Sequence, residues 1–142
     1  MKVFADTSGL FALMVHNDYM HVRAKLNFEY FALKKAQLLT SSFVLVETVA
    51  LLQRRVGVDS VQDFSLKIFP LLDLLWIDEY WYSRAMQRLL THKQKDVSLV
   101  DFLSFEIMEA QEISCAFTFD KHFEDHGFTI AAFHDLDKKR SS

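Results

Sequence analysis

The sequence contains few of the residues that build tight turns and crosslinks. Its 142 residues include 3 Gly, 1 Pro and 1 Cys. An all-β meander needs many tight turns, and a flexible linker needs Gly or Pro, so the composition argues against both. Cys115 has no second cysteine with which to form an internal disulfide, which is typical of a reducing compartment. It lies in an apolar run and is predicted to be a buried, unreactive thiol.

The sequence also lacks a long apolar run and an excess of positive charge. No stretch approaches the length of a membrane-spanning helix, and Asp6 interrupts the first apolar run where a secretory signal would continue. We therefore expect a cytoplasmic protein without membrane contact. The net charge is −3 and the pI is about 6.0, whereas nucleic-acid-binding domains are usually basic. An enzyme whose acidic site is neutralised by a bound metal ion remains compatible with this charge.

Apolar residues are abundant and alternate between two patterns. They make up 51% of the chain, with 14 Phe, which is enough for one domain over residues 1–136 followed by a frayed tail, 137–142. Short apolar runs predict strands, and helical spacing predicts the segments between them. The alternation predicts an α/β fold with a short central parallel sheet and helices on both faces. The expected strands are 3–5, 38–40, 72–77, 113–118 and 128–132, and the expected helices are 7–14, 19–35, 42–55, 61–69, 79–92 and 99–111.

Turn and cap residues set the limits of these segments. Ser41 or Ser42, Asp78 and Ser98 are expected N-caps. Pro70 should end the helix that begins near residue 61. Within helix 19–35 the spacing predicts an apolar face, and residues 120–127 are expected to form a loop. The positions of that apolar face are Val22, Leu26, Phe28, Tyr30 and Leu33.

Two acidic residues follow predicted strands. Asp6 ends the first strand, and Asp120 comes shortly after the fourth. An Asp in such a position can also cap a helix or begin a turn, and for Asp6 taken alone the two interpretations weigh about evenly. If the two strands are neighbours, both carboxylates lie at the edge where open α/β sheets bind their ligands.

Two further acidic residues lie within apolar helices. Glu47 is the only charge between Phe43 and Leu52. A helix that is apolar nearly all round is buried, and a buried carboxylate is usually paired or bound to metal. The alternative is a contact with Gln53, Arg54 or a partner helix. Asp101 follows Ser98 at the spacing of a capping box, but the apolar residues after it would place this first turn beside the end of a strand.

Together these four carboxylates predict a site for a divalent cation. Oxygen ligands without a Cys or His cluster select Mg²⁺ or Mn²⁺ rather than Zn²⁺. An acidic cluster repels itself unless a cation is bound, so a purely structural role is disfavoured. A metal ion held there can activate water and neutralise charge that develops on a phosphodiester. The cluster therefore favours phosphoryl-transfer chemistry.

The chain resembles the PIN-domain ribonucleases, in particular the VapC-type toxins of bacterial toxin–antitoxin pairs and their stand-alone relatives. The matching stretches are residues 3–8, the helix with Glu47, residues 98–105 and residues 117–123, and they occur in the order of the family. The resemblance implies a Rossmann-like α/β/α sandwich and Mg²⁺- or Mn²⁺-dependent cleavage of RNA. It also implies a homodimer and a small antitoxin protein that covers the site.

The resemblance assigns roles to individual residues. Asp6 and Asp101 would ligate the ion, while Glu47 and Asp120 would complete the shell or orient the attacking water. The nearby hydroxyls would be those of Thr7, Ser8 and Thr118. Asp96 is a further acidic candidate, for which a solvated loop position is the alternative. Basic residues that can contact phosphate are Arg54, Arg55, Lys93, Lys95 and Lys121.

Other functions fit the sequence less well. A phosphatase of the haloacid dehalogenase type would need a second Asp where this chain has Ser8. A zinc site at His122 and His126 is disfavoured, because Asp125 and Gly127 make a poor helix. The remaining alternatives are a non-catalytic RNA-binding or protein-interaction module with the same fold and a housekeeping RNA-processing nuclease. Binding of Mg²⁺ or Mn²⁺ would separate a nuclease from the non-catalytic module.

Overall fold

A single parallel sheet organises the molecule. The computed structural model describes residues 1–131, and these include five strands in the order β3-β2-β1-β4-β5. The first strand is therefore central, with β2 and β4 paired to its two edges. The expected domain end at residue 136, the tail 137–142 and the last residue of the fifth predicted strand lie outside the described residues. The strands are β1 (Lys2–Ala5), β2 (Gln37–Ser41), β3 (Asp73–Leu75), β4 (Cys115–Phe117) and β5 (Thr129–Ile130).

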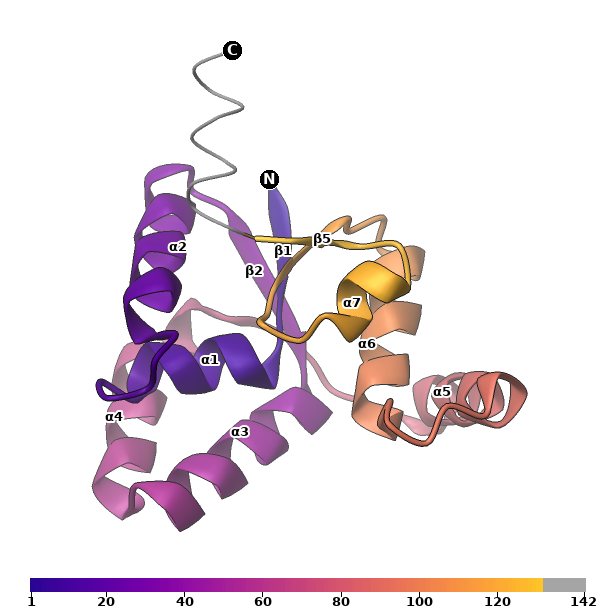
Figure 1. Cartoon of the computed structure of the whole chain (residues 1–142), viewed down its shortest axis with the longest axis horizontal. Helices are drawn as coiled ribbons and strands as arrows, with labels where there is room; N and C mark the ends of the chain where they lie inside the picture. The colour runs from indigo at the N-terminus through magenta and orange to yellow at the C-terminus, as the bar shows by residue number, and fades with distance from the viewer. Residues whose placement is uncertain (132–142) are drawn as a thin grey trace.

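Helices connect successive strands and cover the sheet. In Figure 1, α1, α2 and α4 lie to one side of β1 and β2, while α5, α6 and α7 lie to the other. The predicted α/β/α sandwich is confirmed. The described residues form α1 (Thr7–Met14), α2 (His21–Leu33), α3 (Ser42–Arg55), α4 (Val58–Lys67), the 3₁₀ turn η1 (Phe69–Leu71), α5 (Glu79–His92), α6 (Leu99–Ala110) and α7 (His122–Asp125).

The predicted N-caps are confirmed at three helices. The Oγ of Ser41 accepts a hydrogen bond from the backbone N–H of Val44 at the start of α3. A carboxylate oxygen of Asp78 accepts one from Trp81 at the start of α5, and Ser98 caps α6. Each cap satisfies an N–H group that has no partner within its helix.

Aromatic side chains fill the core between the sheet and its helices. Phe4 and Phe117 on the central strands are fully buried, as are Phe31, Phe102 and Phe105 on the covering helices. The rings of Phe31 and Phe117 meet edge to face with their centroids 5.7 Å apart, a favoured aromatic geometry. The core therefore joins α2 directly to the strand next to β1.

The predicted apolar face of α2 is partly wrong. Val22 and Leu33 are 67% and 80% exposed, whereas Asn27 is buried and its Nδ2 donates a hydrogen bond to the carbonyl of Ala131 at 2.9 Å. The helix instead buries Ala24, Asn27, Tyr30 and Phe31. Hydrophobic spacing missed the true face because Asn27 meets a backbone carbonyl that is distant in the sequence.

Three further predictions need correction. The expected loop 120–127 contains the short helix α7. The helix α4 begins at Val58 instead of residue 61, because Gly57, with a φ of 134°, serves as its N-cap. Cys115 is half-buried in β4, not fully buried. Among residues 1–131, we find no helix long and apolar enough to cross a membrane.

Candidate active site

The candidate site begins where β1 and β4 end side by side. Ala5 is in register with Phe117, and the backbone N–H of Asp6 donates to the carbonyl of Phe117 at 3.0 Å. The two predicted acidic strand ends are therefore neighbours. The helix α1 starts so close to β4 that a Cβ added at Gly9 would lie 2.9 Å from the carbonyl carbon of Phe117. Glycine at this position allows the turn after Asp6 to approach β4.

Hydroxyl groups hold the Asp6 carboxylate in place. Asp6 is 4% exposed, and its Oδ2 accepts hydrogen bonds from the Oγ of Ser8 at 3.0 Å and the Oγ1 of Thr118 at 2.8 Å. The backbone N–H of Phe119 donates to Ser8, and that of Asp120 donates to Thr118. Asp6 occupies the N-cap position of α1 without making a capping hydrogen bond. The capping interpretation of Asp6 therefore fails, and its carboxylate instead belongs to a network between two strand ends.

One cavity brings the four predicted carboxylates together. It has a volume of about 310 Å³ and receives side chains from the ends of β1 and β4 and from α1, α3 and α6. The predicted convergence of distant segments is thus observed. The lining residues are Asp6, Thr7, Ser8, Phe11, Glu47, Leu51, Arg55, Ser98, Asp101 and Asp120.

Glu47 reaches this cavity from a helix that is less buried than predicted. Glu47 is half-buried, and the neighbouring Val46 is 64% exposed. The prediction of a fully buried helix was wrong, because apolar residues of α3 also lie on the molecular surface. Glu47 nevertheless faces the cavity that Asp6 and Asp101 line.

Asp101 combines the two roles that the sequence presented as alternatives. The backbone N–H of Ser98 donates to its Oδ2 at 3.4 Å, and its own N–H donates to the Oγ of Ser98 at 3.1 Å. This reciprocal pair is a capping box. The same side chain lines the cavity, so the cap fixes the carboxylate there.

The cavity disfavours negative charge. Burial raises the pKa of Asp6, although hydrogen bonds from Thr118 and Ser8 oppose the increase. Burial, followed by the charges of Asp6 and Asp120, raises the pKa of Asp101 to about 7. Both carboxyl groups therefore bind protons more readily than an ordinary aspartate, and a divalent cation would relieve the same repulsion. The donor set fits a metal ion that prefers oxygen ligands.

A histidine that the sequence analysis did not assign to this site lies beside two of the carboxylates. One ligand atom from each of Asp101, Asp120 and His122 lies within 4.8 Å of the others. From the sequence, His122 was a candidate only for a zinc site together with His126. Nε2 of His126 instead lies 3.0 Å from Oε1 of Gln94. His122 does not line the cavity itself, and the spacing Asp-x-His after a strand is the signal that could have placed it beside Asp120.

The basic and hydroxyl candidates divide into two groups. Arg55 lines the cavity and its guanidinium lies 5.6 Å from the ring centre of Phe11. Thr7 also lines it, and its buried Oγ1 has no hydrogen-bond partner among the described residues. The remaining basic candidates are exposed and do not line the cavity: Arg54, Lys93, Lys95 and Lys121.

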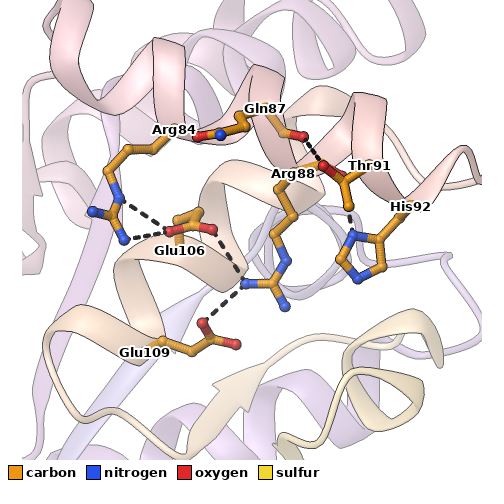
Figure 2. A pocket seen from close by; sticks show the side chains of 7 residues that line it. All are labelled: Arg84, Gln87, Arg88, Thr91, His92, Glu106 and Glu109. Carbon is orange, nitrogen blue, oxygen red and sulfur yellow. Dashed lines mark hydrogen bonds and ion pairs between the residues drawn. The ribbon is translucent and has the colours of Figure 1, made fainter.

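A separate cavity of about 410 Å³ lies between α5 and α6 (Figure 2). Arg84 and Arg88 from α5 pair there with Glu106 of α6, and Arg88 also pairs with Glu109. None of the four predicted carboxylates lines it. Ion pairs neutralise the charges across this contact, although the buried Nε of Arg88 has no hydrogen-bond partner among the described residues. We interpret the contact as packing that holds α6, the helix of Asp101, against α5.

Comparison with known proteins points to one family. The PIN domain family matches residues 3–129. A protein from Mycobacterium tuberculosis named 23S rRNA-specific endonuclease VapC20 is 32% identical over 127 residues, which cover 89% of this chain and 95% of the relative.

Solved structures agree with this match. The crystal structure of Mycobacterium tuberculosis VapC20, described as a sarcin-ricin loop cleaving toxin, has a TM-score of 0.81 at 30% identity and covers 92% of this chain and 98% of that one. VapBC2 from Rickettsia felis, bound to a DNA fragment from its promoter, has a TM-score of 0.69 at 15% identity and covers 92% and 98% of the two chains. The second likeness concerns the fold alone.

Proposed function

This chain belongs to the PIN-domain family, and from that premise we propose that it is a metal-dependent endoribonuclease that acts as a VapC-type toxin. The observation that carries the proposal is the cavity lined by Asp6, Glu47, Asp101 and Asp120. Carboxylates from separate segments converge there at the carboxyl ends of parallel strands, where α/β proteins bind ligands. Clustered carboxylates repel one another when no cation is bound, and a bound cation removes this repulsion.

The four carboxylates would hold Mg²⁺ or Mn²⁺. Asp101 and Asp120 supply ligand atoms that lie close together, and Asp6 and Glu47 line the same cavity. When bound, the ion would activate a water molecule and neutralise charge on the phosphodiester. Ser8 and Thr118 keep the Asp6 carboxylate oriented through their hydrogen bonds. This support for Asp6 limits the reorganisation that ion binding requires.

Arg55 is the basic residue that we propose contacts RNA phosphate. It lines the acidic cavity, so its guanidinium can meet a phosphate whose other oxygens face the ion. Arg54, Lys93, Lys95 and Lys121 remain surface charges that can contribute to general attraction of RNA. Thr7 adds a hydroxyl in the cavity that can bind water or a phosphate oxygen.

RNA is the substrate class that we propose, and 23S rRNA is the first RNA to test, because the relative from Mycobacterium tuberculosis is named for it. A ribosomal target would place the activity in the cytoplasm. We also propose a small antitoxin protein that covers the cavity, since that relative is described as a toxin. A homodimer completes the proposed assembly.

The test compares wild type with Asp101→Asn on purified ribosomes and on total RNA, in Mg²⁺ and in Mn²⁺, with RNA ends mapped by primer extension. We expect the substitution to lower cleavage at least about 100-fold, which corresponds to about 2.7 kcal/mol of barrier. An Asn at this position can still accept the Ser98 N–H hydrogen bond, so the fold should remain intact.

The matched control is Asp63→Asn, because Asp63 is exposed on α4 and outside the cavity. It should cleave at the wild-type rate. Full activity of Asp101→Asn would refute the proposed site. Metal binding by wild type without cleavage of any RNA would favour the non-catalytic module.

A further inference from the structure

The proposed four-carboxylate site gives no role to His122, which lies beside Asp101 and Asp120. It is the first residue of α7 and its side chain is 18% exposed. Its Nδ1 is buried and has no hydrogen-bond partner among the described residues, although it lies 2.8 Å from Oδ1 of Asp120. A buried polar atom without a partner is costly. Asp120 can pair with this nitrogen when the ring is protonated. In the neutral ring Nδ1 has no hydrogen-bond partner among the described residues and can bind a cation.

The local backbone explains why Asp120 does not form a hydrogen bond with Nδ1. Oδ1 of Asp120 already accepts the backbone N–H of His122 at 2.9 Å, the hydrogen bond that starts α7. The same turn brings Nδ1 against that oxygen at an angle that does not make a hydrogen bond. Asp101 approaches this pair from α6. One ligand atom from each of the three side chains lies within 4.8 Å of the other two.

The other ring nitrogen of His122 has a partner. Nε2 lies 3.2 Å from Oδ2 of Asp96 in the segment before α6. If Nε2–H donates to this carboxylate, Nδ1 carries the lone pair and faces Asp101 and Asp120. Metal-binding histidines typically donate their second N–H to a carboxylate in this way, which fixes both the tautomer and the ring. Asp96, for which the sequence left open a role in the acidic site or a solvated loop position, would thus act by orienting the histidine ring.

We propose that Nδ1 of His122 is a ligand of the metal ion, together with Asp101 and Asp120, and that Asp96 orients its ring. The proposal rests on the proposed metal-dependent function and refines it. A nitrogen ligand favours first-row transition ions, whereas Mg²⁺ prefers oxygen ligands only. The site would therefore select Mn²⁺ over Mg²⁺, in contrast to the oxygen-only site predicted from the sequence.

The test uses Mn²⁺ itself as the probe. Wild-type protein is titrated with Mn²⁺ and with Mg²⁺ by calorimetry, and the bound Mn²⁺ is examined by pulsed electron paramagnetic resonance, which detects coupling to a directly bound ¹⁴N. We expect the nitrogen signal in wild type and at least about tenfold tighter binding of Mn²⁺ than of Mg²⁺.

Three variants separate the roles. His122→Gln should lose the nitrogen signal and at least about tenfold in Mn²⁺ affinity, with little change for Mg²⁺. Asp96→Asn should keep the signal but bind Mn²⁺ about tenfold more weakly. The matched control is His126→Gln, because Nε2 of His126 already faces Gln94, and it should behave as wild type. Circular dichroism and thermal melting establish that each variant is folded.

Two results would overturn the proposal: bound Mn²⁺ without nitrogen coupling in wild type, or unchanged Mn²⁺ affinity in folded His122→Gln. Either can occur while wild type still cleaves RNA, and the proposed ribonuclease would then stand with oxygen ligands only. Absence of both Mn²⁺ binding and RNA cleavage in wild type would instead reject the ribonuclease and the histidine ligand together.

Discussion

At the scale of a single residue, Asp101 caps a helix with a carboxylate whose negative charge its surroundings disfavour. The capping box uses its carboxylate to start α6, while burial and the charges of Asp6 and Asp120 raise its pKa to about 7. In the unfolded chain the pKa of the same group is near its ordinary value of 3.8. The folded protein therefore binds this proton more tightly. Protonation of Asp101 therefore stabilises the folded state, fully below pH 3.8, and this stabilisation is lost as the pH rises through about 7.

This sign leads to a prediction for the metal-free protein. With EDTA present, Asp101→Asn should raise the melting temperature, because the amide keeps the cap without adding charge. The gain should be larger at pH 8 than at pH 5, on the order of 2–4 °C for each kcal/mol in a domain of this size. Differential scanning fluorimetry at the two pH values measures it.

Asp63→Asn provides the comparison. Asp63 forms an exposed ion pair with Lys67 at 3.7 Å, and such pairs contribute little to stability. It should change the melting temperature by less than about 1 °C at either pH. An Asp101→Asn variant that melts below wild type at pH 8 would show that the cap outweighs the charge repulsion in the cavity.

At the scale of elements, local sequence signals predicted the starts of helices better than their buried faces. Ser41, Asp78 and Ser98 act through hydrogen bonds to residues three positions ahead, so the nearby sequence contains all that is needed. The faces of α2 and α3 depend on distant neighbours. Hydrophobic spacing could not foresee that Asn27 would meet Ala131 or that Val46 would be exposed.

The same distinction applies to the site. The carboxylates were predictable because each interrupts an apolar segment or follows a strand. The position of His122 beside Asp101 and Asp120 was not predictable, because it depends on a short helix that hydrophobic spacing does not reveal. Arg55 lines the cavity and Arg54 does not. This difference depends on the rotation of α3 about its axis, which the sequence of an apolar helix does not determine.

The contact between α1 and β4 gives a prediction for an element. Alanine is a better helix former than glycine by about 1 kcal/mol, so Gly9→Ala would stabilise an unobstructed helix. Here the added Cβ would lie 2.9 Å from the carbonyl carbon of Phe117. We therefore expect the opposite sign, a loss of about 1–3 kcal/mol from overpacking, measured by chemical denaturation.

The consequence should reach the site, because α1 carries Ser8 and follows Asp6 directly. In Gly9→Ala that remains folded, Mn²⁺ binding should weaken as the Ser8–Asp6–Thr118 contacts are displaced. Ser65→Ala, a surface substitution on α4 that lines a different cavity, should leave metal binding unchanged. Gly9→Ala with wild-type or higher stability would show that α1 can move away from β4 without cost.

At the scale of the whole molecule, topology joins segments that are far apart in the sequence. Because β1 is central, with β2 and β4 as neighbours, the elements that follow these three strands meet at one edge. Parallel sheets with helices on both faces impose this arrangement. The alternation of strands and helices predicted that Asp6 and Asp120 meet only if their two strands are neighbours. The strand order that meets this condition, and the detailed cavity, required the structure.

The overall charge of −3 leads to the last prediction. A protein without a basic excess should depend on its bound cation, and on few basic side chains, to attract RNA. We expect EDTA to weaken RNA binding at least about tenfold, and the slope of log affinity against log salt to be about −3 or shallower, as a small number of phosphate contacts requires. Stopped-flow fluorescence anisotropy can measure binding before cleavage proceeds.

Two adjacent arginines provide matched variants for this measurement. Both side chains belong to exposed residues, but Arg55 lines the acidic cavity and Arg54 does not. Arg55→Ala should weaken RNA binding about tenfold to 100-fold, the range expected for loss of one charge-assisted phosphate contact. Arg54→Ala should change it less than about twofold. Equal effects of the two substitutions, or tight binding in EDTA with a steep salt dependence, would mean that RNA is held by the general surface charge. The cavity would then select the bond that is cut without contributing to the capture of RNA.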